Sequence, residues 1–207
     1  MTATLLLFLS GLVIGSFLNV VSLRYKAGKR LLTFDVLFGR SHCSFCKKKL
    51  SWYELIPLIS FIIQLGRCRH CHKVLSLQYP FVELLSAATL AVVPMFFSPE
   101  IVWVSIVLTL ILISAIDFRL SVIPDQLNIL LGLLGVALIV GDNPGDIALW
   151  KDKFFGMLLG AAILGLVVLV TRGKGMGIGD LKLIAALGFI FGIEKVVLIT
   201  AVSFLLG

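Results

Sequence analysis

The chain has 207 residues, of which 59% are hydrophobic, and a formal net charge of +7 from 18 Lys and Arg against 11 Asp and Glu. Soluble domains contain about 45–50% apolar residues, so a soluble core cannot bury this much apolar surface. The composition excludes a soluble protein and indicates an all-α polytopic membrane protein. The positive charge is explained by cytoplasmic loops and anionic lipid, without nucleic acid.

Apolar runs of near-membrane length alternate with short polar connections along the chain. A transmembrane helix needs about 20 apolar residues. The sequence predicts seven spans, or six if the last two fuse, at 5–23, 81–97, 101–116, 126–140, 154–170, 181–193 and 196–206. We therefore divide the chain into a first transmembrane helix (1–23), a cytoplasmic segment (24–80) and a multi-span membrane domain (81–207).

The distribution of Lys and Arg predicts the orientation in the membrane. Eleven of the 18 lie between the first and second predicted spans, which makes this segment cytoplasmic and places the N-terminus outside. With alternating spans, fifteen basic residues fall inside and three outside. The third span then ends at Asp117, and the sixth starts at Asp180, so both carboxylates are expected near the cytoplasmic face.

All four cysteines occur in the cytoplasmic segment, as two C-x2-C pairs with 21 residues between them. Paired C-x2-C turns present four thiolates tetrahedrally to zinc, and four protein ligands make a structural site. The predicted ligands are Cys43, Cys46, Cys68 and Cys71. The alternatives are a redox pair, unligated thiols, or replacement of one cysteine by His42, His70 or His72.

Asp117 and Asp180 both border apolar sequence, and Asp180 follows a glycine-rich stretch at 173–179. A carboxylate beside hydrocarbon costs about 2.5–3.5 kcal/mol on insertion scales, which points to a functional reason. Two close carboxylates do not both ionise readily, and such a pair can activate water for peptide hydrolysis. Gly177 and Gly179 have no side chains and would let a substrate backbone come close.

Two other functions would use some of these features. A proton- or ion-coupled transporter also uses membrane aspartates but does not explain the cysteines. A zinc-bearing scaffold without catalysis leaves both aspartates unexplained. The sequence contains no G-x-S-x-G and no H-E-x-x-H motif.

Four further polar residues have structural interpretations. Asp125 precedes the fourth predicted span and is expected to be its N-cap. Glu54 and Glu83 are expected at helix termini or beside an arginine. Asn19 is expected to hydrogen-bond another helix.

At this point the motifs resemble those of the type IV prepilin peptidases, also called prepilin leader peptidase/N-methyltransferases. The matching segments cover most of the chain in the family's order: 15–21, 41–46, 50–57, 66–71, 79–83, Asp117 with 123–125, and 175–183. The resemblance implies an aspartic endopeptidase with Asp117 and Asp180 as the catalytic pair. It also implies zinc on the four cysteines.

The family resemblance further implies a place and a substrate. Members reside in the bacterial inner membrane, with the active site facing the cytoplasm, and remove the basic leader from prepilins or pseudopilins of pilus, secretion and competence systems. Many then methylate the new N-terminus with S-adenosylmethionine. Members often have Gly-Lys where this chain has Gly66-Arg67, a position associated with methyl transfer. They usually continue past Gly207, so the chain is expected to be a short or truncated member.

Overall fold

The computed structural model describes residues 2–28, 31, 33, 36, 39–172 and 177–206, which form helices and loops. These residues fall into two compact units, Met1–Ser121 and Val122–Gly207. The glycine-rich residues 173–176 lie outside the described part. The predicted all-α architecture is confirmed.

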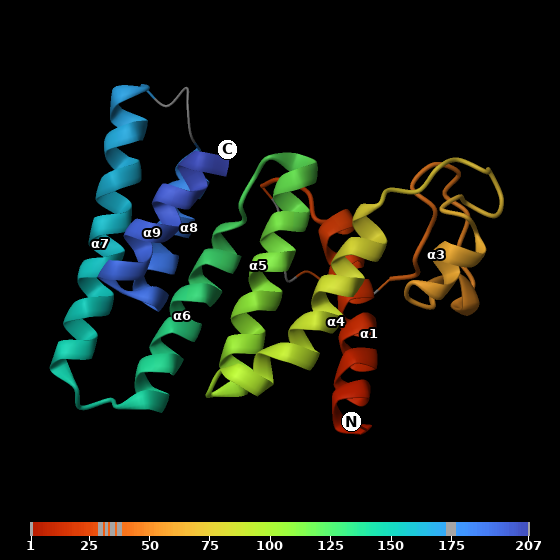
Figure 1. Cartoon of the computed structure of the whole chain (residues 1–207). Coiled ribbons are helices and arrows are strands. Elements are labelled where there is room, and N and C mark those ends of the chain that lie inside the picture. The colour runs from red at the N-terminus through yellow and green to blue at the C-terminus, as the bar shows by residue number, and fades with distance from the viewer. Residues whose placement is uncertain are drawn as a thin grey trace. The chain divides into compact units, whose positions relative to one another are not determined.

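The N-terminal unit is built on three long helices that lie side by side (Figure 1): α1 (Thr2–Arg24), α4 (Gln78–Phe96) and α5 (Glu100–Leu120). Small residues let α1 approach α4 closely. A Cβ placed on Gly11 would lie 2.5 Å from the Cα of Ala87, and one on Gly15 would lie 2.7 Å from the Cα of Glu83. The Gly-x3-Gly spacing of α1 therefore sets this helix pair.

Between α1 and α4 the chain forms a small lobe beside these two helices (Figure 1). It contains a 3-10 helix η1 (Trp52–Leu55) and a five-residue helix α3 (Ile59–Ile63). Pro57 separates the two, so this apolar stretch forms two short helices and not a membrane span. Trp52, Ile62 and Ile63 are exposed on the lobe.

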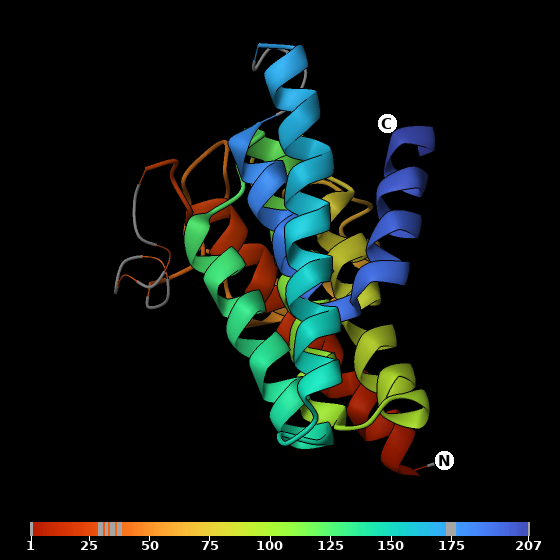
Figure 2. The ribbon, with the colours of Figure 1, turned by 90° about the vertical axis from the view of Figure 1, so that its left-hand side faces the viewer.

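The C-terminal unit contains α6 (Asp125–Asp142), α7 (Ile147–Val170), α8 (Ile178–Phe191) and α9 (Ile193–Leu206). Helix α8 packs on the other three, and α7 runs along both α8 and α9 (Figure 2). Gly156 of α7 meets the backbone of α8, where an added Cβ would lie 2.5 Å from the carbonyl oxygen of Gly188. Gly192, with φ +84°, separates α8 from α9.

Among the described residues, five helices are long and apolar enough to cross a membrane: α1, α4, α5, α6 and α7. They match the first five predicted spans. The last two predicted spans correspond to α8 and α9, which have 14 residues each. Each short helix covers about 21 Å at 1.5 Å per residue, less than the roughly 30 Å hydrocarbon core.

Candidate functional site

The four cysteines lie at two similar turns related by a shift of 25 residues. In the first turn, the N–H of Lys47 donates to Cys43 O and the N–H of Cys43 donates to Lys48 O, both at 3.0 Å. In the second, His72 N–H donates to Cys68 O and Cys68 N–H donates to Lys73 O, both at 2.9 Å. The residue after each second cysteine is left-handed, with φ of 57° at Lys47 and 55° at His72. The sequence thus builds the same knuckle twice.

The two knuckles bring four sulfur atoms together. All four lie within 4.8 Å of one another, and the sulfurs of Cys43 and Cys71 are 3.9 Å apart. Zinc–sulfur bonds of about 2.3 Å in a tetrahedron place sulfurs about 3.8 Å apart, so the cluster fits zinc. The predicted grouping of these cysteines is confirmed.

The thiols of this cluster differ in acidity. Backbone N–H groups of Cys71 and His70 lower the pKa of Cys68 to about 7, against the effect of burial. The N–H of Lys73 also favours the Cys71 thiolate, but desolvation and the other thiols raise the pKa of Cys71 to about 11. One thiolate therefore makes the next harder to form, and a divalent cation would relieve this repulsion.

Basic side chains tie the knuckles to their surroundings. Lys48 Nζ lies 3.2 Å from Nδ1 of His70, which joins the first knuckle to the second. The guanidinium of Arg69 lies 5.4 Å from the ring centre of Tyr53 in η1. These contacts join the two knuckles to each other and to η1.

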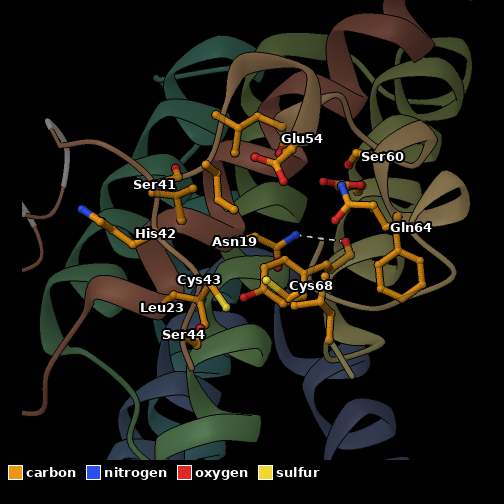
Figure 3. Close-up of a pocket in the computed structure, with 18 of the residues that line it drawn as sticks. Asn19, Leu23, Ser41, His42, Cys43, Ser44, Glu54, Ser60, Gln64 and Cys68 are labelled. Carbon is orange, nitrogen blue, oxygen red and sulfur yellow. Dashed lines mark hydrogen bonds between the residues drawn. The ribbon is translucent and has the colours of Figure 1, made fainter. Parts of the chain in front are cut away.

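A pocket of about 690 Å³ opens between α1, the lobe and α4, within the N-terminal unit (Figure 3). Its lining is rich in polar groups and includes Asn19, Glu54, Gln64, Tyr79, Glu83 and Arg119. Cys43 and Cys68 also line it, so the knuckles form one wall. The volume falls in the range of about 300–1,000 Å³ typical of small-molecule sites.

Buried polar side chains shape this pocket. Asn19 Nδ2 donates to Tyr79 O at 3.0 Å, which confirms the predicted contact between α1 and another helix. Glu54 Oε2 accepts from the N–H of Ser51 at 2.8 Å, and Glu83 Oε2 accepts from the N–H of Leu58 at 2.8 Å. Glu54 thus lies at a helix terminus, as predicted, whereas Glu83 lies inside α4 and accepts from the residue before α3.

Asp117 lies in the last turn of α5, and its side chain is exposed. Its carbonyl oxygen accepts from the N–H of Ser121 at 2.7 Å, where a left-handed residue with φ 50° ends the helix. Arg119, two residues on, donates to Leu23 O and Tyr25 O, both at 2.7 Å. Arg119 thereby holds the end of α5 against the end of α1.

Asp180 lies in the first turn of α8, in the C-terminal unit, and is half-buried. Its Oδ2 accepts from the N–H of Gly177 at 3.0 Å, so the carboxylate sits where the helix dipole favours negative charge. A Cβ on Gly179 would lie 3.2 Å from Cβ of Ile123. Gly179 therefore has a packing role that the sequence did not reveal, whereas Gly177 is exposed.

Asp125 is not the N-cap of α6, so that prediction was wrong. Pro124 occupies the N-cap position, with φ −66° and ψ 127°, and Asp125 is the first helical residue. Its carboxylate instead accepts from Lys182 Nζ at 2.7 Å, which connects the starts of α6 and α8. Proline has no N–H to pair and its φ is fixed at about −65°, so Pro124 is tolerated at the N-cap. The helix therefore starts at Asp125, one residue earlier than predicted.

The predicted methyl-transfer position lies at the start of the second knuckle. Gly66 is buried with φ +66°, and an added Cβ would lie 3.1 Å from the Phe61 ring. Arg67 is exposed and pairs by a β-bridge with Val74. Phe61 lines the pocket, so Gly66 packs against a side chain of the pocket wall.

Comparison with known proteins places these features in a family. The sequence profile of the Bacterial Peptidase A24 N-terminal domain matches residues 9–97, and that of the Type IV leader peptidase family matches residues 104–207. The chain belongs to the type IV leader peptidase family. No solved structure matches the chain.

Individual members of this family align along nearly the whole chain. A prepilin leader peptidase/N-methyltransferase of Bacillus subtilis is 33% identical over 98% of this chain and 79% of its own length. The protein with the same name from Aeromonas hydrophila is also 33% identical, over 98% of this chain and 78% of its own length. One from Klebsiella pneumoniae is 31% identical over 88% of this chain and 82% of its own length. The chain is accordingly a multi-pass membrane protein of this family.

Proposed function

We propose that the chain is an aspartic endopeptidase that removes the basic leader from type IV prepilins or pseudopilins. Its membership of the type IV leader peptidase family carries this proposal. The name of these relatives, prepilin leader peptidase/N-methyltransferase, supports the substrate class. The five long apolar helices support action on a membrane-bound substrate.

We assign the catalytic roles to Asp117 and Asp180. One carboxylate, ionised, takes a proton from water as the water attacks the scissile carbonyl, while the other, protonated, hydrogen-bonds the carbonyl oxygen. The pair shares one proton and titrates as a unit, so neither aspartate alone is the acid.

The charge distribution supports the proposed orientation. With the lobe in the cytoplasm, the four cysteines face a reducing compartment where thiolates are available to zinc. We place the protein in the bacterial inner membrane, with the active site near the cytoplasmic face. A prepilin presents its basic leader there, and the lobe is positioned to receive it.

Two cofactors follow from the proposed function. Cys43, Cys46, Cys68 and Cys71 would hold a structural zinc ion, because their sulfurs all lie within 4.8 Å of one another. The relatives' name includes N-methyltransferase, so we propose a second reaction at the new N-terminus with S-adenosylmethionine, which supplies a reactive methyl group. The polar pocket of the N-terminal unit is a suitable size for such a ligand, and Gly66 and Arg67 flank its wall.

Cleavage of a co-expressed prepilin tests the catalytic pair. Asp117→Asn and Asp180→Asn keep size and one acceptor oxygen, so each should abolish cleavage while the protein still inserts and folds. Asp125→Asn is the matched control and should retain cleavage, because within the described residues Asp125 makes an exposed ion pair with Lys182. Cleavage by either of the first two variants would contradict the pair, and solute flux without cleavage would favour a transporter.

A further inference from the structure

The polar pocket of the N-terminal unit contains a carboxylate oxygen without a partner. Glu54 is 7% exposed, and only its Oε2 is engaged, by the N–H of Ser51. Oε1 is buried and has no hydrogen-bond partner among the described residues. A buried acceptor left unpaired costs about 1–3 kcal/mol, more when charged, so this oxygen is suited to a ligand that donates hydrogen bonds.

The terminal guanidinium nitrogens of the two arginines that line the pocket donate to backbone carbonyl groups. Arg24 donates to Val36 O at 3.2 Å and to Gly39 O at 2.7 Å. Arg119 donates with both terminal nitrogens to the end of α1. Among the residues that the structure describes, no ion pair neutralises Glu54. The negative charge of Glu54 is therefore available to a cation that enters the pocket.

The pocket also holds a donor without a partner. Nε of Arg119 is buried and makes no hydrogen bond within the described part of the chain. Oε1 of Glu54 would accept from an ammonium group, and Nε of Arg119 would donate to an oxygen acceptor elsewhere in the same pocket. In the view of Figure 3, Asn19 is drawn between Glu54 and the cysteines Cys43 and Cys68, so the lining between the two ends is also polar.

We propose that this pocket binds a primary ammonium group through Oε1 of Glu54. The inference rests on the proposed second reaction, because an N-methyltransferase must bind an amine. Two ligands of the proposed second reaction carry a primary ammonium group. One is the new N-terminus of the cleaved chain, and the other is the amino-acid part of the methyl donor. The pocket lies within the N-terminal unit, whereas Asp180 belongs to the C-terminal unit.

Binding to the purified full-length protein, loaded with zinc, distinguishes the two sources. The first probe pair is a peptide with the N-terminal sequence of the cleaved prepilin, prepared with either a free or an acetylated N-terminal amine. The second pair is S-adenosylhomocysteine and 5′-methylthioadenosine, which share a nucleoside and a thioether but differ in the amino-acid part. In the pair that matches the natural ligand, the probe with the ammonium group should bind about tenfold tighter, or more, than its partner without one. This is the difference expected for a charge-assisted contact.

Glu54→Gln keeps one acceptor for the N–H of Ser51 but removes the charge. It should reduce the ratio of the two affinities within that pair to about one. Glu194→Gln, an exposed carboxylate in α9, is the matched control and should preserve it. Equal binding within both probe pairs in the wild type would overturn the proposal, and this measurement needs no variant. An unchanged preference in Glu54→Gln would also overturn it.

The cleavage assay separates this proposal from the peptidase assignment. Prepilin cleavage by Glu54→Gln is measured beside its ammonium preference. Loss of both cleavage and ammonium preference, with zinc still bound, would refute a separate amine site. Cleavage by Asp117→Asn would refute the catalytic pair and leave the ammonium measurement unaffected.

Discussion

Replacing Gly156 with alanine tests the close packing of α7 on α8. The new Cβ would lie 2.5 Å from the carbonyl oxygen of Gly188 and 2.7 Å from the carbonyl carbon of Gly192, whereas ordinary contact begins at 3.4 Å. The helices must therefore separate by about 0.9 Å (3.4 − 2.5), because backbone atoms cannot rotate away. Overpacking of this kind costs about 1–3 kcal/mol, or about 5- to 160-fold in the folding equilibrium constant.

Gly132→Ala is the matched control for this substitution. Gly132 also lies inside a long helix, but a Cβ there would meet nothing within 4 Å. Both variants gain alanine's helix propensity, about 1 kcal/mol over glycine, so their difference isolates the packing cost. Unfolding in mixed micelles with increasing dodecyl sulfate, followed by circular dichroism, measures it. Equal stability of the two variants would refute the packing argument.

Three further predictions concern the zinc cluster and two basic residues. Cys46→Ser should lower the zinc content from about one per chain to near zero, measured by elemental analysis under reducing conditions; full zinc content would point to another ligand set. Lys182→Met should change the free energy of unfolding by less than about 1 kcal/mol, because its ion pair with Asp125 is exposed; a larger loss would show a structural role. Arg119→Met should lower the free energy of unfolding by about 1.5–3 kcal/mol, since it removes charged hydrogen bonds to two carbonyl groups. Unfolding in dodecyl sulfate measures this loss, and a smaller loss would contradict the prediction.

The long helices were predictable because each one is a continuous apolar run with polar ends. The knuckles were predictable as well, since C-x2-C spacing demands a tight turn whose ends meet. Asn19 followed the same logic, because a buried amide within a span needs a partner. In all three cases the information lies within a short segment, where local chemistry determines the outcome.

The contacts that depend on distant segments could not be predicted from the sequence. Nothing near Glu54 in the chain shows that one of its oxygens stays unpaired, because that depends on what α1 and α4 bring to the pocket. The packing of Gly179 against Ile123 likewise joins residues 56 positions apart (179 − 123). The Gly-x3-Gly spacings at Gly11 and Gly156 were visible in the sequence, but only a neighbouring helix gives them meaning.

The separation of features between the two units bears on how two reactions could share one chain. The zinc knuckles and the pocket with Glu54 lie entirely in the N-terminal unit, and the glycine-flanked Asp180 lies in the C-terminal unit. Cys43 and Cys68 belong both to the metal cluster and to the pocket wall. Zinc on this cluster would therefore stabilise the shape of the pocket directly. Amine binding should accordingly fall when zinc is removed.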